Sequence, residues 1–121
     1  MSGRDGVESP ASGLRMTPRD LAKIGELVRA YGEWRGRPVV PAAWIREMLV
    51  PRQHTDGGTG YGYHWYLEKL GGHDSIAAMG NGGQRLVIVP GLALTIAVTC
   101  GNYDDPEQWR TPQAVLEQIT A

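Results

Sequence analysis

The chain of 121 residues lacks phenylalanine, has a single cysteine and carries almost no net charge. Because Cys100 stands alone, an internal disulfide and a cysteine-rich zinc site are excluded. The 12 basic and 13 acidic residues nearly balance, so no surplus of one sign attracts nucleic acid or an anionic membrane. No apolar run approaches the roughly 20 residues of a membrane-spanning helix. The residues after Met1 do not resemble a secretory signal, and the sequence assigns the chain no compartment.

Glycine is abundant instead, with 17 residues, about twice the usual share. The apolar share of 41% is ordinary for a globular protein. A chain of this length fits one domain and buries roughly two-thirds of its unfolded surface on folding. Residues 1–13 are small, polar and aperiodic and are predicted to be a flexible lead. The folded domain is therefore predicted over residues 14–121.

Three helices are predicted, over residues 17–31, 41–49 and 111–120. Thr17 and Pro18 form a typical helix start, and Gly32 is expected to end the first helix. Thr111 and Pro112 repeat that start before the last helix. The expected apolar faces are Leu21, Ile24, Leu27, Val28 and Tyr31; then Trp44, Ile45 and Met48; and finally Val115, Leu116 and Ile119.

Four antiparallel strands are predicted where the pattern changes to β-branched and aromatic residues. They span 61–67, 75–80, 84–89 and 92–99, after a glycine-rich loop at 50–60. Pro90-Gly91 joins the last two strands as a hairpin, and their nearly continuous apolar sequence predicts cover on both faces. The predicted fold class is α+β, with helices packed on an antiparallel sheet of about four strands.

The three histidines do not form a metal-binding pattern. His54, His64 and His73 are 10 and 9 residues apart, whereas ligands that share a face are spaced i, i+4 on a helix or i, i+2 on a strand. No metal site is predicted. His54, on the glycine-rich loop, is a weak candidate for a residue that faces a cleft.

The sequence also holds no complete nucleophile site. No serine lies in Ser-x-x-Lys or in Gly-x-Ser-x-Gly. Cys100 ends an apolar run and is predicted to be buried and inert. Asp104 and Asp105 are typical of a turn, and Asp74 with Glu68 makes no convincing acid–base pair.

The glycine-rich segment Gly80-Asn81-Gly82-Gly83-Gln84 lies between two predicted strands. A phosphate-binding loop joins a strand to a helix, so phosphate binding is not predicted here. Two interpretations of the glycines remain open. They allow either a bulge and close contact between backbones, or a close approach of the backbone to a ligand.

Four segments, taken in order, resemble a known family. They are 13–25 (GLRMTPRDLAKIG), 36–45 (GRPVVPAAWI), 61–65 (YGYHW) and 80–90 (GNGGQRLVIVP). Together they are similar to the serine β-lactamase family, in its class C and esterase branch. That branch includes penicillin-binding-protein-like esterases and 6-aminohexanoate-oligomer hydrolases. The resemblance covers residues 13–120 but only the C-terminal part of the family's β-lactamase-like, or transpeptidase-like, domain.

Of the family's three catalytic motifs, this chain has a counterpart of one. Ser-x-x-Lys and Tyr-x-Asn are absent. Ala78-Met79-Gly80 stands at the family's Lys-Thr-Gly position without its cation and hydroxyl, which favours an esterase- or amidase-like parent over a β-lactamase. The resemblance implies that the backbone N–H of Asn81 donates to the oxyanion hole. It assigns substrate contact to Ala78, Met79, Gly80, Gly82 and Gly83, and it implies no cofactor and no metal.

The resemblance therefore predicts the C-terminal fragment of a serine hydrolase, inactive alone because the nucleophile lies outside it. The alternative is a binding or assembly module that kept the sheet and lost catalysis; a free-standing enzyme centred on His54 or Cys100 is least favoured. The expected partners are the missing N-terminal part of the parent domain, or a second copy through self-association or domain swapping. The parent's expected substrate is a small ester or amide, and neither nucleic acid nor membrane is an expected partner.

Overall fold

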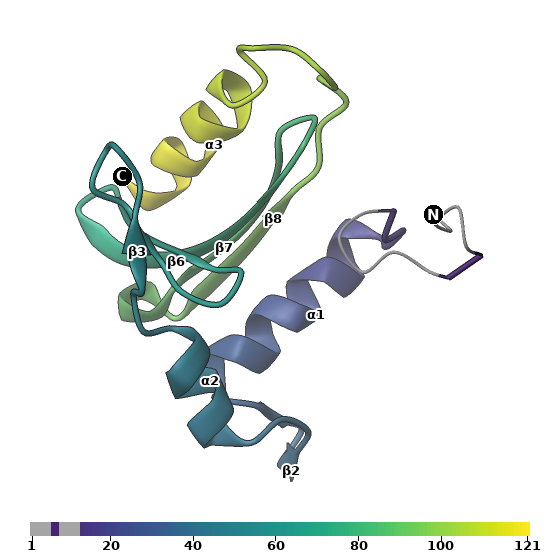
Figure 1. Cartoon of the computed structure of the whole chain (residues 1–121), viewed down its shortest axis with the longest axis vertical. Helices are drawn as coiled ribbons and strands as arrows, with labels where there is room; N and C mark the ends of the chain where they lie inside the picture. Colours follow the sequence, from purple (N-terminus) through teal and green to yellow (C-terminus); the bar gives the residue numbers. More distant parts are fainter. Residues whose placement is uncertain (1–5, 8–12) are drawn as a thin grey trace.

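The computed structural model describes residues 6–7 and 13–121, so most of the lead predicted over residues 1–13 lies outside the described residues. A curved antiparallel sheet lies between helix α3 on one face and helix α1 on the other (Figure 1). The fold is α+β, as predicted. No helix among the described residues has the length and apolar character needed to cross a membrane.

The main sheet has six strands that lie in the order of the sequence. They are β3 (Gln53–His54), β4 (Gly60–Tyr61), β5 (Tyr66–Leu70), β6 (His73–Gly80), β7 (Gln84–Val89) and β8 (Leu94–Val98). The four longer strands, β5 to β8, form the predicted sheet. The short strands β3 and β4 extend this sheet. β3 lies within the segment 50–60 that was predicted as a loop, and β4 begins at the last residue of that segment. A separate hairpin of β1 (Glu33–Trp34) and β2 (Arg37–Pro38) follows the first helix.

The strand predicted over 61–67 is broken in the structure. The chain leaves the sheet after β4 and returns only at β5, with His64 in the left-handed region at φ 65°. Gly62 lies against the end of the second helix, where a Cβ would stand 2.2 Å from the Met48 carbonyl oxygen. The Tyr63 amide donates to that same oxygen at 2.9 Å. This tertiary contact, which local sequence does not reveal, interrupts the strand.

Helix α1 (Pro18–Arg29) begins as predicted and ends two residues early. The Thr17 hydroxyl accepts from the Asp20 amide at 3.1 Å, which satisfies one of the free N–H groups of the first turn. Tyr31, expected on the apolar face, instead follows the helix at φ 52° and is exposed. Gly32 follows at φ 90°, where a Cβ would overlap the Val40 carbonyl oxygen.

The other two helices correct the predicted apolar faces. In α2 (Ala42–Met48), Ile45 and Met48 are buried but Trp44 is 51% exposed. In α3 (Arg110–Thr120), Leu116 is buried, whereas Val115 and Ile119 are exposed. The residues that α3 buries are Pro112, Leu116 and Thr120, spaced i, i+4, i+8. Trp109, not Thr111, stands at the cap, and Pro112 is tolerated because first-turn amides have no intrahelical acceptor.

The core is built on both faces of β7. Leu86 and Ile88 belong to the cluster on the α1 and α2 side, and Val87 and Val89 belong to the cluster on the α3 side. All residues of β7 from Arg85 to Val89 are buried. The prediction that the last hairpin is covered on both faces is therefore confirmed for β7.

Helix α1 approaches the sheet closely at Gly25. A Cβ at this position would stand 2.5 Å from the Thr95 Cγ2 and 3.0 Å from the Leu86 Cδ1. At the next residue, Glu26 accepts a hydrogen bond from the Thr95 hydroxyl at 2.5 Å. Hydrogen bonds from Arg29, and then from Thr95, hold the pKa of Glu26 below its usual value. Gly25 and Glu26 together locate α1 over β8.

Arg85 forms a buried ion pair with Glu68 of β5. The guanidinium Nη2 lies 2.7 Å from the carboxylate, and the two side chains are 4% and 18% exposed. Burying such charges costs free energy that the pair must offset. Arg85 Nε has no partner among the described residues. The pair links β7 to β5 under α3.

Candidate functional site

The predicted site residues lie at the end of β6 and in the loop that follows it. Ala78, Met79 and Gly80 are the last residues of the strand, and Asn81-Gly82-Gly83 connects it to β7. The β6–β7 pairing ends at Gly80 opposite Gln84. The structure adds the segment after β8, residues 100–109, which folds against this loop.

One backbone edge of β6 is open beside the loop. The pairing of β5 with β6 ends at Tyr66 opposite Ala77, so within the described part of the chain residues 78–80 pair only with β7. The chain before β5 turns away, because the Gly62 amide donates to the Trp65 carbonyl at 2.9 Å. An open edge of this kind accepts an extended segment through main-chain hydrogen bonds.

Gly82 and Gly83 are explained by contacts within the protein. Both have positive φ, 91° and 87°. A Cβ at Gly82 would stand 2.7 Å from the Tyr103 ring, and one at Gly83 would stand 2.7 Å from the Gln108 carbonyl oxygen. At Gly83 the structure supplies the close contact between backbones, one of the two interpretations left open by the sequence, whereas Gly82 makes room for the Tyr103 side chain. Their assignment to substrate contact stays a prediction.

Gly80 differs from its two neighbours. Its φ is not in the left-handed region. A Cβ there would lie 3.4 Å from the Gln84 Cβ, an ordinary van der Waals distance. Packing within the described residues therefore does not require glycine at position 80. A requirement for close approach by a ligand remains the reason that the resemblance gives.

A single side-chain oxygen holds both loop amides. Gln108 Oε1 accepts from the Gly82 amide at 2.5 Å and from the Gly83 amide at 3.2 Å. The Asn102 amide donates to the Gly82 carbonyl at 3.1 Å. These contacts occupy the donors that a substrate oxygen would otherwise meet at Gly82 and Gly83.

Two further side chains link the loop to the segment after β8. Gln84 donates to the Cys100 carbonyl at 2.5 Å and accepts from the Cys100 amide at 3.2 Å. Asn81 Nδ2 donates to the Asp104 carboxylate at 3.0 Å, and Asn81 Oδ1 accepts from the Asp104 amide at 3.2 Å. Cys100 is half-buried rather than fully buried.

The backbone N–H of Asn81 takes part in none of these hydrogen bonds. Its side chain is engaged with Asp104 and the next two amides with Gln108. The hydrogen bonds of the described residues include no acceptor for the Asn81 N–H itself. Asn81 is also exposed. This N–H is therefore available to a carbonyl oxygen or an oxyanion placed beside the end of β6.

The other candidates from the sequence do not assemble into a site. His54 lies in β3, His64 in the turn before β5 and His73 at the start of β6. No group of three His, Cys, Asp or Glu residues able to hold a metal occurs within the described part of the chain. Asp74 pairs with Lys69 at 2.6 Å, whereas Glu68 pairs with Arg85.

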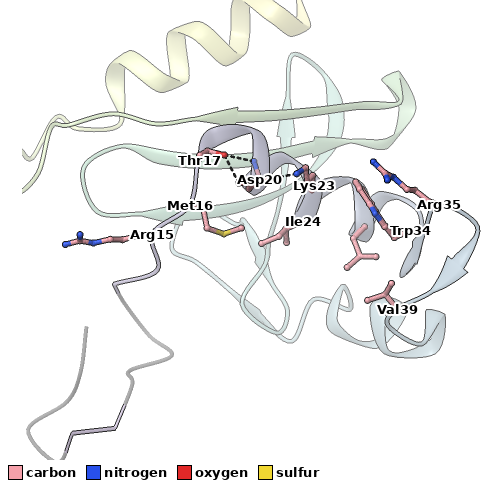
Figure 2. A pocket seen from close by; sticks show the side chains of 10 residues that line it. Arg15, Met16, Thr17, Asp20, Lys23, Ile24, Trp34, Arg35 and Val39 are labelled. Carbon is pink, nitrogen blue, oxygen red and sulfur yellow. Dashed lines mark hydrogen bonds and ion pairs between the residues drawn. The ribbon is translucent and has the colours of Figure 1, made fainter.

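A large cavity lies away from the loop. It has a volume of about 1010 Å³ and is lined only by residues between Arg15 and Val39. Figure 2 shows Met16, Ile24 and Val39 along it, with Lys23 paired to Asp20 at 2.6 Å. The Thr17 hydroxyl donates to the Asp20 carboxylate and caps α1, so it is not poised as a nucleophile. A shallower cavity of about 520 Å³ adjoins the loop and is lined by Asn81, Asp104, Asp105, Pro106, Gln108 and Trp109.

Gln84, Asp104 and Gln108 were not identified as site residues from the sequence. Gln108 is 25 residues from Gly83 and lies in no recognisable motif. A glutamine before a helix has many possible roles. Only the return of the chain after β8 brings it to the loop, so local sequence gave no signal.

Comparison with known proteins agrees with this fold. Residues 1–118 match the family model described as Beta-lactamase. Among solved structures, the chain is similar to a Bacillus anthracis protein assigned as a 6-aminohexanoate-dimer hydrolase, with 20% sequence identity and a TM-score of 0.75 over 97% of this chain. The chain spans 31% of that protein's length. No protein with a curated description matches the chain.

Substitution of the loop glycines by alanine separates packing from other roles. Gly82→Ala places a Cβ in the left-handed region and 2.7 Å from Tyr103, so we expect the free energy of unfolding to fall by about 1–3 kcal/mol. Gly80→Ala meets no such obstacle, and we expect a change within about 0.5 kcal/mol. Urea denaturation of the two variants measures the difference. Equal losses would contradict the packing explanation.

Proposed function

The chain belongs to the beta-lactamase family, and from this we propose that it is the C-terminal part of a serine hydrolase of esterase or amidase type. In this proposal it contributes the strand that lines the cleft and one donor of the oxyanion hole. The nucleophile comes from another segment of the hydrolase, so the chain alone is inactive. The part of the similar Bacillus anthracis protein that this chain does not span is 69% of its length, since the chain covers 31%.

The observation that carries the proposal is the uncommitted amide of Asn81. It stands at the end of the open edge of β6, while the amides of Gly82 and Gly83 are already held by Gln108. A substrate lying along residues 78–80 would bring its carbonyl to the Asn81 N–H, which has no acceptor among the described residues. The same residue is the donor that the family resemblance implies.

The chemistry explains why a single donor matters. In acyl transfer, a serine oxygen attacks the carbonyl carbon, its proton passes to a base, and the carbonyl π electrons move onto oxygen. A hydrogen-bond donor aimed at that oxygen stabilises the transition state by roughly 3 kcal/mol. Asn81 supplies one such donor. Collapse of the intermediate re-forms the carbonyl and breaks the bond to the leaving group, which takes the proton from the base and departs as the alcohol or amine. Water then attacks the acyl-serine in the same way, releasing the acid and restoring the serine hydroxyl.

The only serine among the described residues is not placed to act as a nucleophile. Ser75 is 3% exposed, and its hydroxyl donates to the Glu68 carbonyl at 3.2 Å. Ala78 and Met79 supply neither a cation nor a hydroxyl beside the open edge. A substrate with an obligatory carboxylate would therefore lack a partner there, which favours a small neutral ester or amide.

A non-catalytic binding or assembly module is the second candidate. The open edge of β6 favours it, because an extended peptide could add to residues 78–80 without any reaction. The two candidates differ in what joining to a nucleophile-bearing segment does. If the chain is part of a hydrolase, joining it to that segment produces turnover. If the chain is a binding module, it does not.

The isolated chain should show no hydrolytic chemistry. We expect no turnover of p-nitrophenyl acetate or nitrocefin above the buffer rate, and no adduct with a serine-directed fluorophosphonate by intact-mass spectrometry. Ser75→Ala serves as the matched control for the buried hydroxyl. Stoichiometric labelling of any serine in the folded chain would contradict the proposal.

We also propose that the isolated chain self-associates through β8. This strand is the edge of the main sheet, and its residues Leu94–Val98 carry no charge. An uncharged open edge is a template for pairing with another strand. The exposed apolar side chains along the α1 cavity, such as Val39 at 60% exposure, offer further surface to a second copy or to the rest of the domain.

Light scattering over a range of concentrations tests this proposal. We expect a dimer at high concentration and a shift to monomer in Thr99→Lys, because a charge at the end of the edge strand opposes pairing. Thr99 is exposed, so the core is not disturbed. A monomer at every concentration of the unmodified chain would count against self-association.

A further inference from the structure

Gln108 ties the start of α3 to the loop before β7. It lies two residues before Arg110, the first residue of α3, and its side chain is half-buried. Its own amide donates to the Asp105 carbonyl at 3.1 Å, which fixes its backbone in a turn. Its Oε1 then accepts from two consecutive amides, those of Gly82 and Gly83. One neutral oxygen therefore orients two adjacent peptide groups.

The need for such a restraint follows from the residues restrained. Glycine has no Cβ and rotates about φ and ψ with little steric cost, so two adjacent glycines allow the chain many backbone conformations. The Asn102 amide holds the Gly82 carbonyl, and Gln108 holds the two N–H groups. These contacts fix one backbone conformation for the residues that directly follow Asn81.

We infer that Gln108 is a positioning residue for the Asn81 amide, an inference that rests on the proposed role of that amide as an oxyanion donor. Strand β6 fixes Asn81 from the preceding side, through the pairing of Gly80 with Gln84. Gln108 fixes it from the following side through Gly82. Preorganised donors are effective because they need no reorientation as charge develops.

The chemical nature of the side chain fits this role. A carboxamide oxygen accepts two hydrogen bonds while adding no charge. A carboxylate at the same place would accept equally well but would oppose a negative oxygen forming nearby. Gln113, on α3 itself, offers a contrast, since its side-chain amide donates to Glu117 at 2.8 Å and none of the hydrogen bonds of the described residues joins its side chain to the loop.

Hydrogen exchange measured by NMR on the full chain tests the inference. In the unmodified chain we expect the Gly82 and Gly83 amides to be protected although they lie in a loop, and the Asn81 amide to exchange fast. Gln108→Met keeps the length of the side chain but removes the acceptor. It should accelerate exchange at Gly82 and Gly83 roughly fivefold or more and should shift the Asn81 amide resonance.

Two variants make the result specific. Gln108→Glu restores an acceptor and should retain the protection of both glycines, and Gln113→Met should leave all three loop amides unchanged. Unprotected glycines in the unmodified chain would overturn the inference even if Gln108→Met fails to fold. An unmoved Asn81 resonance in a folded Gln108→Met would also overturn it. Exchange needs no catalysis, so its outcome is independent of the fluorophosphonate labelling that tests the proposed function.

Discussion

The double-sided burial of β7 is the constraint on which the rest of the structure depends. Its residues from Arg85 to Val89 are all buried, with alternate side chains in the α1 and α3 clusters. A slip by one residue would exchange every side chain between the two faces, so the register of the strand is tightly specified. The register places Gln84 opposite Gly80, and with them the loop between β6 and β7.

The contacts of the loop leave the Asn81 N–H without an acceptor among the described residues. Segment 100–109 returns along the end of the sheet and engages the loop through Gln84, Asp104 and Gln108. The glycines are needed so that Tyr103 and the Gln108 backbone can approach closely. What is left after these contacts is the N–H of Asn81 beside an open strand edge. The packing of the core thus fixes the loop, and the loop fixes the position of the N–H on which the proposed chemistry depends.

Local patterns predicted those parts of the fold that depend on local interactions. The start of α1 at Thr17, strand β7 and its antiparallel pairing with the following strand all follow from caps, spacing and turn residues. The predicted strand over 92–99 is shorter, because Pro90–Leu92 form a 3-10 turn and β8 begins at Leu94. The contact of Gly62 with Met48 and the outward face of α3 depend on distant segments. The prediction of one unbroken strand over 61–67 was therefore wrong, and so was the inward placement of Val115 and Ile119, whereas Leu116 is buried as predicted. Within the site, Asn81 came from family resemblance, whereas Gln108 emerged only from the fold.

The most direct test of the central claim measures ester hydrolysis after this chain is combined with a segment that carries Ser-x-x-Lys. Asn81→Pro removes the backbone N–H, and Asn81→Ala keeps it while removing the side chain that contacts Asp104. The account predicts that Asn81→Pro lowers kcat roughly 100- to 1000-fold relative to Asn81→Ala. Equal kcat values for the two folded variants would contradict the assignment of this amide as an oxyanion donor.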